Sequence, residues 1–168
     1  KPDGLTVVSP DRMEPFLQKM RGKGMLIISG RPGSGITSTL YSLLREHDAF
    51  TRQLVTFQAK IEVELENITQ HVYKDPASLA RDLASGLRRD PDTVMLDQCP
   101  DRETAELIVK AADQKLVLLG MHANDSITAL AKWVKVCGDT TAALRHLNAV
   151  VCQMLLRRAS GQGRVLAL

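Results

Sequence analysis

A short apolar run followed directly by a glycine-rich stretch limits what this chain can fold into more than any other feature of its sequence. The run is Met25–Ser29 (MLIIS), the stretch is Gly30–Thr39 (GRPGSGITST), and residues 37–47 carry apolar side chains at helical spacing. An uninterrupted apolar run of this length is typical of a strand buried on both faces, as in a parallel sheet. The order therefore predicts a strand, a tight loop and a helix.

The glycine-rich stretch matches most of the phosphate-binding pattern G-x-x-x-x-G-K-[ST]. Gly30, Gly35 and Thr37 fit this pattern, but Ile36 stands where it has lysine. With Gly33, these glycines allow the close approach and positive φ angles that point successive backbone N–H groups at an anion. The alternative interpretation is a turn that only links strand to helix, and the loop by itself favours neither.

Two properties of such a loop depend on side chains that follow the last glycine. Thr37 provides the hydroxyl that would hold Mg²⁺ in an active loop. Ile36 cannot replace the charge-assisted hydrogen bond of lysine, which is worth roughly 1.5–3 kcal/mol, so phosphate affinity should fall roughly ten- to a hundredfold. An aliphatic side chain also offsets none of the charge on a phosphoryl group in transfer.

The composition is that of one ordinary globular domain. The chain has 168 residues, of which 44% are hydrophobic and 24% charged, and it has no apolar segment of membrane-spanning length and no signal peptide. Aromatic residues make up 4% and the net charge is +3, which disfavours a nucleic-acid-binding module. Three dispersed cysteines, Cys99, Cys137 and Cys152, suggest small buried side chains in a reducing compartment.

The chain alternates between predicted strands and predicted helices. Residues 1–24 are expected to be a lead-in from a missing N-terminal region, and residues 25–168 to form the domain. Beyond the first strand, strands are predicted at 52–57, 67–73 (an outer strand or hairpin arm), 93–97, 115–121 and 164–168, and helices at 77–89, 103–113, 125–136 and 140–158. The alternation predicts an α/β three-layer sandwich with a mainly parallel sheet, whose ligands bind at the carboxyl ends of the strands.

Polar residues follow two of these predicted strands. Asp97 stands where an aspartate could hold a Mg²⁺-bound water, and Gln98 where a glutamate would activate water. A glutamine orients water but cannot accept its proton at neutral pH. His122 could sense a phosphate, because histidine titrates near neutrality. Structural alternatives remain open: Asp97 as a cap on the next turn, and His122 as a satisfied structural residue.

Taken together, these segments resemble the C-terminal ATPase domain of the type II secretion and type IV pilus ATPases, hexameric motors of the RecA-like P-loop class. The resemblance implies a RecA-like P-loop three-layer sandwich with a mainly parallel central sheet. It extends over nearly the whole chain in four ordered segments, and the closing GQGRVLAL is similar to the pilus-retraction branch. The four segments are residues 24–44 (GMLIISGRPGSGITSTLYSLL), 87–107 (LRRDPDTVMLDQCPDRETAEL), 116–130 (LVLLGMHANDSITAL) and 152–158 (CQMLLRR).

The departures from this family concentrate at its catalytic positions. Besides Ile36, the replacements are Gln58-Ala-Lys-Ile-Glu62 for the acidic box, Asp97 for glycine, Gln98 for the catalytic glutamate, Pro100, Ala84 and Met154 for arginines. Arg88, His122, Asn124 and Asp125 are kept. Losing the cation, the acidic box and the water-activating carboxylate together removes each kind of group that phosphoryl transfer needs. The resemblance therefore implies a degenerate member with fold but no turnover.

The leading hypothesis is a pseudo-ATPase with a structural or regulatory role in a bacterial secretion or pilus assembly. A second is a nucleotide-binding switch without hydrolysis, in which Arg31 or Lys60 supplies the missing charge; a third is a slow ATPase that powers export or pilus assembly. No catalytic residue is predicted. The vestigial nucleotide-binding residues are Gly30, Gly33, Ser34, Gly35, Ile36, Thr37, Ser38, Asp97, Gln98 and His122.

The resemblance also carries expectations about ligands and partners. ATP or ADP with Mg²⁺ is the only cofactor it suggests, and Thr37 and Asp97 would contact the metal only if a nucleotide binds. Partners would be proteins of the secretion or pilus machine, including an active homologous ATPase in a ring, and not nucleic acid. The chain would lie in the cytoplasm, peripheral to an inner-membrane machine and in contact with the membrane only indirectly.

Overall fold

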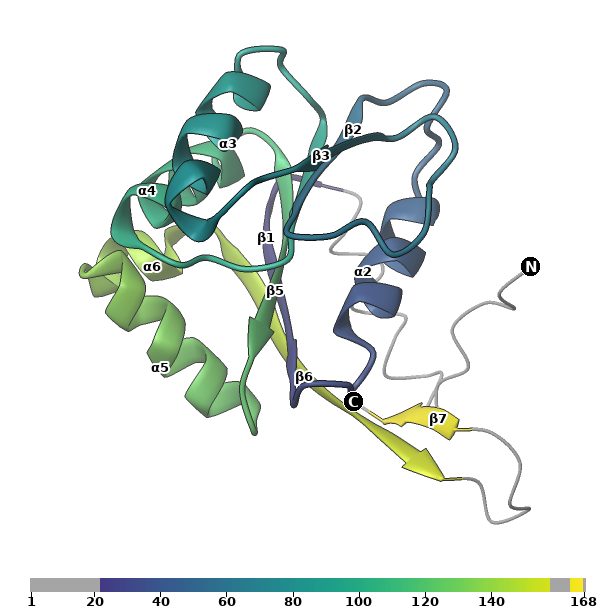
Figure 1. The fold of residues 1–168 in the computed structure, drawn as a ribbon. Helices are drawn as coiled ribbons and strands as arrows, with labels where there is room; N and C mark the ends of the chain where they lie inside the picture. The colour runs from purple at the N-terminus through teal and green to yellow at the C-terminus, as the bar shows by residue number, and fades with distance from the viewer. Residues whose placement is uncertain (1–21, 158–163, 168) are drawn as a thin grey trace.

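One sheet of seven strands organises the described residues, 22–157 and 164–167 of a computed structural model (Figure 1). Its strand order is β3-β2-β4-β5-β1-β6-β7. The strands are β1 (Gly24–Gly30), β2 (Leu54–Gln58), β3 (Thr69–Val72), β4 (Thr93–Leu96), β5 (Leu116–His122), β6 (Leu147–Arg157) and β7 (Arg164–Ala167). The helices are α2 (Ile36–Arg45), α3 (Leu79–Leu87) after the 3-10 turn η2 (Pro76–Ser78), α4 (Arg102–Ala112), α5 (Ser126–Cys137) and α6 (Thr140–Arg145).

The sheet is mainly parallel, as the sequence predicts. Every neighbouring pair of strands is parallel except β6 and β7, which pair antiparallel. The β3 strand pairs parallel with β2 at the edge of the sheet, so it is the predicted outer strand and not a hairpin arm. The first strand, β1, lies between β5 and β6, and all seven of its residues are buried.

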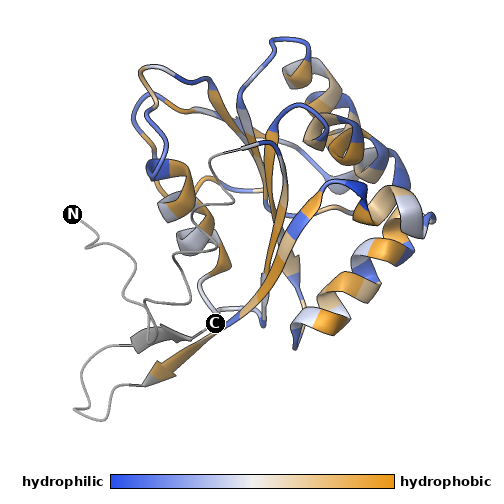
Figure 2. Ribbon diagram, turned by 180° about the vertical axis from the view of Figure 1, so that it is seen from behind, coloured by the Kyte–Doolittle hydropathy of each residue, from blue (hydrophilic) through white to orange (hydrophobic). Residues whose placement is uncertain are grey.

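Side chains that alternate along the central strands divide the core into two layers. Leu26 and Ile28 of β1 pack with the apolar face of α2, whereas Met25 and Ile27 face the opposite side. That opposite side is covered by α3, α4, α5 and α6 (Figure 1). Figure 2 shows hydrophobic residues concentrated along the central strands and on the faces of the helices. The arrangement is the predicted three-layer sandwich, with successive side chains of each strand serving opposite layers.

The prediction of one long helix over residues 140–158 is wrong. Helix α6 ends at Arg145, and His146 leaves helical geometry with φ −120° and ψ 15°. The following residues form β6, which pairs with β1 from Leu147 to Gln153. An apolar run cannot be assigned to helix or strand by periodicity alone, and here the open edge of β1 decides the outcome.

Three helices on the same face begin directly after an aspartate. Asp101, Asp125 and Asp139 each accept a hydrogen bond from a backbone N–H in the first turn of α4, α5 and α6, at 2.8, 2.7 and 2.8 Å. Such caps satisfy N–H groups that have no partner within the helix. They explain why these helices start where they do.

Other predictions concern single residues and the ends of the chain. Cys137 is buried and Cys99 and Cys152 are partly buried, and all three are free thiols. Burial raises the pKa of Cys99 to about 12 and that of Cys137 to about 11.

Most of the lead-in 1–24 and the turn at 160–163 lie outside the described residues. Among the described residues, no helix combines the length and apolar character needed to cross a membrane.

Trp133 provides a test of how the helical layer is held together. Its side chain is fully buried, and its Nε1–H donates a hydrogen bond of 2.9 Å to the carbonyl oxygen of Ala143, which joins α5 to α6. Trp133→Phe should destabilise the protein by about 1–3 kcal/mol in denaturant unfolding, because it removes buried contacts and leaves that carbonyl unpaired. Ile127→Ala on the same helix, where the side chain is 79% exposed, should change stability by less than about 0.5 kcal/mol.

Candidate functional site

The glycine loop has the backbone geometry of an anion site. Gly33 and Gly35 adopt left-handed φ angles of 78° and 85°, and the N–H of Ser34 donates to the carbonyl oxygen of Arg31 at 3.0 Å. Gly35 is the N-cap of α2, whose first turn has no side-chain cap and no acidic residue. The first N–H groups of a helix have no partner within the helix, so they remain as donors for an anion.

The loop is held against strand β6. The Nε2–H of Gln153 donates to the carbonyl oxygen of Ser34 at 2.7 Å, and both residues are buried. Gly30 lies so close to β6 that a Cβ atom there would stand 2.7 Å from the carbonyl oxygen of Gln153. Among the described atoms, the Ser34 hydroxyl and the Gln153 Oε1 are buried without a hydrogen-bond partner. Gly30 therefore has a packing role whether or not an anion binds.

Ile36, at the position of the missing lysine, belongs to the hydrophobic core. It is 9% exposed and packs in the same cluster as Leu26, Ile28 and Leu40, beneath the first turn of α2. An aliphatic side chain in this position contributes to folding through burial rather than to ligand binding. Thr37 and Ser38, the next two residues, are partly buried and exposed respectively.

A hydrogen-bonded network occupies the end of β4, where Asp97 and Gln98 follow the strand. The Tyr73 hydroxyl donates to Asp97 Oδ1 at 2.7 Å, and the backbone N–H of Ala59 donates to Asp97 Oδ2 at 2.7 Å. The Gln98 Nε2–H donates to the Tyr73 oxygen at 2.6 Å. Both carboxylate oxygens and the glutamine amide are thus engaged within the protein, which agrees with the interpretation of Asp97 as a residue that fixes the adjoining turn.

Burial affects the ionisation of this network. Burial raises the pKa of Asp97 above its ordinary value of 3.8, while the hydrogen bonds from Ala59 and Tyr73 act in the opposite direction. The pKa of Tyr73 is raised by burial and by its bond to Asp97. The tyrosine therefore remains a hydrogen-bond donor to the carboxylate at neutral pH.

A second network joins β2 to α2. Gln58 is buried, its Nε2–H donates to the Tyr41 hydroxyl at 2.8 Å, and its Oε1 accepts from the Thr56 hydroxyl at 2.9 Å. All three groups are neutral. In the resemblance described above Gln58 takes the place of the first acidic residue of the acidic box, so a buried amide stands there instead of a carboxylate.

His122 and Asp125 lie at and after the end of β5. His122 is exposed, and its carbonyl oxygen accepts a hydrogen bond of 2.8 Å from Lys132 Nζ. Asp125 caps α5 through Thr128, and these hydrogen bonds lower its pKa. The structure gives Asp125 a clear structural role and leaves the His122 side chain available to solvent.

The predicted site residues converge at one edge of the sheet, because β4, β5 and β1 are neighbours and parallel. A cavity of ≈ 350 Å³ there brings Ile36 and Thr37 together with Asp97, Gln98 and His122. Gly30, Gly33, Ser34, Gly35 and Ser38 are not part of its lining and form the loop and first turn beside it. The remaining lining residues are Leu40, Ala59, Cys99, Gly120 and Met121.

Sequence reasoning missed the residues that hold this site in place. Tyr73 bonds to Asp97, Gln153 to the backbone of Ser34 and Tyr41 to Gln58, and nothing in the sequence marks these three side chains for such contacts. Tyr73 ends the predicted outer strand, which is the only signal that could have placed it near Asp97. These contacts depend on the order of strands in the sheet.

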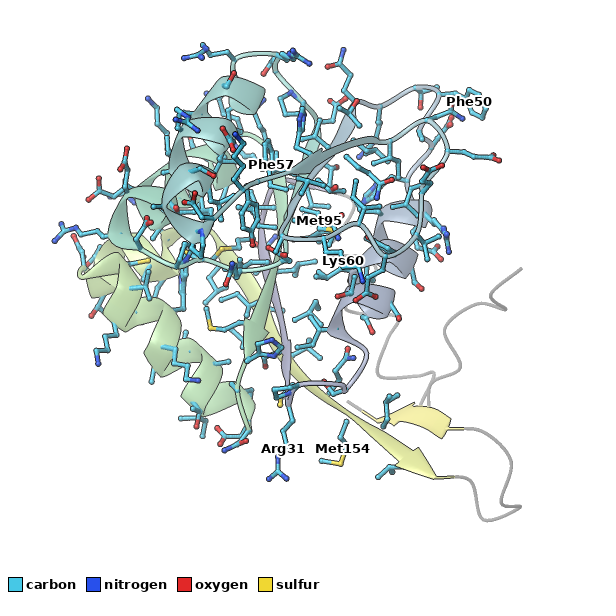
Figure 3. All side chains as sticks on the ribbon, in the orientation of Figure 1. Arg31, Phe50, Phe57, Lys60, Met95 and Met154 are labelled. Atoms are coloured by element: carbon cyan, nitrogen blue, oxygen red, sulfur yellow. The ribbon has the colours of Figure 1, made fainter. Side chains whose placement is uncertain are left out.

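The site suits a phosphate group better than a metal ion. The uncapped helix and the left-handed glycines fit an anion, and the unpartnered Ser34 hydroxyl adds a polar group beside them. The Asp97 oxygens already accept hydrogen bonds, and the described residues contain no group of three histidine, cysteine or acidic side chains able to hold a metal. Neither Arg31 nor Lys60 lines the cavity, and Figure 3 shows the Arg31 side chain extending away from the molecule.

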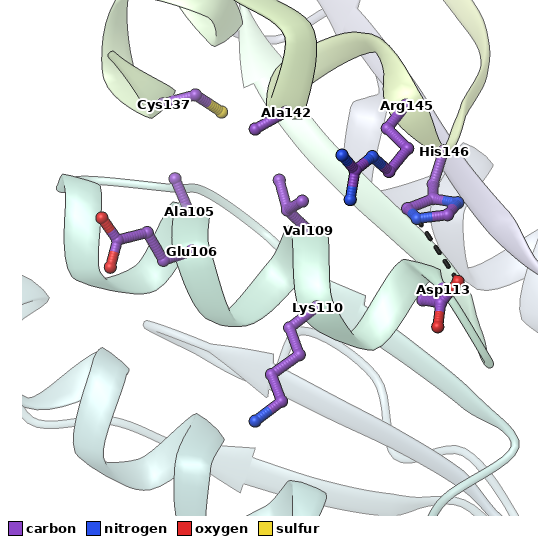
Figure 4. Close-up of a pocket in the computed structure, with 9 residues that line it drawn as sticks. All are labelled: Ala105, Glu106, Val109, Lys110, Asp113, Cys137, Ala142, Arg145 and His146. Atoms are coloured by element: carbon purple, nitrogen blue, oxygen red, sulfur yellow. Dashed lines mark ion pairs between the residues drawn. The ribbon is translucent and has the colours of Figure 1, made fainter. Parts of the chain in front are cut away.

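Another cavity, of ≈ 420 Å³, lies between α4 and the α5–α6 region (Figure 4). Acidic and basic side chains both line this cavity, and His146 Nε2 lies 3.4 Å from Asp113 Oδ1. Its apolar lining comes mainly from small side chains such as Ala105 and Ala142. This mixture indicates no single ligand chemistry and is separate from the glycine loop.

The fold and the loop define an α/β domain in which a glycine-rich loop joins β1 to α2 and Ile36 stands where the phosphate-binding pattern has lysine. The family model for type II/IV secretion system proteins matches residues 4–166, so this chain belongs to that family. This assignment confirms the resemblance seen in the sequence.

Similar proteins agree with this family. The chain is 38% identical over 137 residues to type II secretion system protein E of Pseudomonas aeruginosa, covering 80% of this chain and 27% of that protein. It is 35% identical over 141 residues to the type IV pilus assembly ATPase PilB of Myxococcus xanthus, covering 82% and 25%. The chain thus spans about a quarter of the length of these relatives. The pilus retraction motor PilT, solved with bound ADP, shares the fold at a TM-score of 0.73 and 24% identity, covering 91% of this chain and 48% of that chain.

The Asp97 network predicts a pH-dependent effect of removing one hydroxyl. Tyr73→Phe should destabilise the protein by about 1–3 kcal/mol near pH 7.5, because a partly buried carboxylate loses a donor and Gln98 loses its partner. The destabilisation caused by Tyr73→Phe should be smaller near pH 5. Burial already raises the folded-state pKa of Asp97, and removing a donor to the carboxylate raises it further, so the added penalty grows as the pH rises through the folded-state pKa.

Denaturant unfolding at both pH values measures this difference. Tyr41→Phe is the matched control, since it removes a buried hydroxyl bonded to the neutral Gln58, and its cost should not change with pH. An equal loss for Tyr73→Phe at both pH values would contradict the described role of Asp97.

Proposed function

We propose that this chain is a catalytically inactive secretion- or pilus-ATPase-like domain with a structural or regulatory role. The observation that carries the proposal is the closed network of Asp97, Tyr73 and Gln98 at the position where such a domain needs groups that act on water. The amide of Gln98 cannot accept a proton at neutral pH, and its N–H donates a hydrogen bond to the Tyr73 oxygen.

Each of the three requirements of phosphoryl transfer is weakened in this site. The cation is replaced by the buried Ile36, which offsets no phosphoryl charge. A metal ion at Asp97 would have to compete with the N–H of Ala59 and the hydroxyl of Tyr73 for the carboxylate oxygens. The first position of the acidic box is a neutral glutamine bonded to Tyr41. These changes remove different groups that act together on the same transfer step.

A structural or regulatory role fits the intact framework around this site. In this proposal the domain (25–168, after the lead-in 1–24) stands beside an active homologous ATPase in a ring, or links its parent protein to a secretion or pilus machine. Its place would be cytoplasmic, at the periphery of an inner-membrane machine. The support is membership of the type II/IV secretion family together with the complete sheet and its helical layers.

A nucleotide-binding switch without hydrolysis is the second candidate. The uncapped N-terminus of α2 and the left-handed Gly33 and Gly35 supply backbone donors for phosphate, and the cavity beside them includes Thr37 and His122. The structural neighbour PilT was solved with ADP. In this alternative ATP or ADP binds weakly, and Mg²⁺ adds little because both Asp97 oxygens already accept hydrogen bonds.

A hydrolysis assay separates these proposals from a slow ATPase. The purified protein should release no phosphate from ATP and Mg²⁺ above the background of a Thr37→Val variant, which keeps the side-chain shape but lacks the hydroxyl. Turnover that requires Thr37, or that disappears in Asp97→Ala with the fold intact, would sink the inactive-domain proposal.

Calorimetric titration with ATP and ADP, each with Mg²⁺ or with chelator, separates the two inactive roles. A bound nucleotide at 100 times its dissociation constant should also add roughly 2.7 kcal/mol of stability. The switch predicts saturable binding that Thr37→Val weakens and that chelation leaves nearly unchanged, with Ser85→Ala, an exposed serine elsewhere, as control. Absence of binding by every nucleotide would leave the structural role.

A further inference from the structure

A cavity of ≈ 520 Å³ lies at the amino ends of β2 and β3, away from the glycine loop. Figure 3 places Phe50, from the rim of this cavity, and Arg31, from the loop, at opposite ends of the molecule. The size is within the range of small-molecule sites. Its lining includes Phe50, Arg52, His71 and Arg89.

The charged side chains that line this cavity are of one sign. They are the guanidinium groups of Arg52 and Arg89, and no aspartate or glutamate is part of the lining. Within the described part of the chain neither arginine forms a salt bridge. Arg52 Nη1 instead lies 3.5 Å from Nδ1 of His47, and burial together with the nearby Arg52 charge lowers the pKa of that histidine. The cavity therefore contains positive charge without a neutralising partner.

A fixed imidazole adds a further polar group. The ring of His71 stacks on Phe57 with centroids 5.0 Å apart and planes inclined by 13°. Its Nε2 atom is buried and has no hydrogen-bond partner among the described residues. A buried polar atom without a partner is costly, and a ligand that bonds to it would remove that cost.

The carboxylates beside the cavity are occupied by local hydrogen bonds. Asp48 accepts from the N–H of Phe50 at 2.9 Å and from the Thr51 hydroxyl at 3.0 Å, which lowers its pKa and shapes the turn that presents Phe50 and Arg52. Asp92 accepts from the N–H of Gln53 at 2.8 Å. These acids organise the walls of the cavity rather than pairing with its arginines.

From this arrangement we propose that the cavity binds a small phosphorylated ligand with a planar ring, of the nucleoside monophosphate class. Arg52 and Arg89 would hold the phosphate group, since guanidinium groups match phosphate oxygens with paired N–H donors. His71 Nε2 donates to the same group. Phe50, 87% exposed at the rim, offers a ring face for stacking. This site is independent of the glycine loop and of the function proposed for it.

Titration of the purified protein with AMP tests the proposal. Arg52→Gln and Arg89→Gln should each weaken AMP binding roughly tenfold or more, because each removes a charge-assisted contact. Arg88→Gln is the matched control, an exposed arginine next to Arg89 that does not line the cavity, and it should leave the affinity unchanged. Thr37→Val should also have no effect, which separates this site from the glycine loop.

Ribose 5-phosphate, which lacks the base, tests the contribution of Phe50. AMP should bind several-fold more tightly than ribose 5-phosphate, and Phe50→Ala should remove this preference while retaining binding of the sugar phosphate. The proposal is overturned if AMP shows no saturable binding at about millimolar concentration, if both arginine variants bind as the unaltered protein does, or if Thr37→Val abolishes binding.

Discussion

The parallel pairing of β1 with β5 on one side and β6 on the other is the interaction on which the rest of the structure depends. Every residue of β1 is buried, so its backbone groups are satisfied only if both neighbours are present. The same pairing sets Gly30 against Gln153 and the glycine loop against the end of β5. Because the pairing is made by backbone groups, it tolerates changes of side chain at the loop, and the framework persists while the chemistry of the site changes.

The site illustrates how charge can be removed from a binding edge without leaving buried polar groups unsatisfied. Gln58 finds Tyr41 and Thr56, while Asp97, in a position surrounded by donors, finds Tyr73 and Ala59. An unpaired buried group would cost about 1–3 kcal/mol, so substitutions at such positions persist only where partners exist. Among the described residues, two of the six buried side-chain atoms without a partner, the Ser34 hydroxyl and the Gln153 Oε1, lie beside the glycine loop. These two atoms lie next to the backbone donors that the loop offers to an anion.

Much of the fold could be predicted because the apolar runs of β1, β4 and β5 and the leucines of α3 have strong local patterns. The β6 strand could not, since LNAVVCQMLL suits a buried helix as well as a buried strand until its pairing with β1 is known. For the site, the sequence predicted which residues gather at one edge but not what they contact. The partners of Asp97 are 24 and 38 residues away in the chain, and only the order of strands brings them together. The sequence left two interpretations of Asp97 open, a residue that holds a Mg²⁺-bound water and a cap on the next turn. They differ in what the carboxylate contacts, which the sequence does not reveal.

The burial of Ile36 decides how well a lysine would be tolerated at this position. Its side chain is buried with Leu26, Ile28 and Leu40, and such burial is worth about 1.5–3 kcal/mol to the folded state. Replacing Ile36 by lysine would remove that stabilisation and place an ammonium group against an apolar cluster. A lysine at position 36 therefore carries a cost in folding stability that is independent of anything the loop binds.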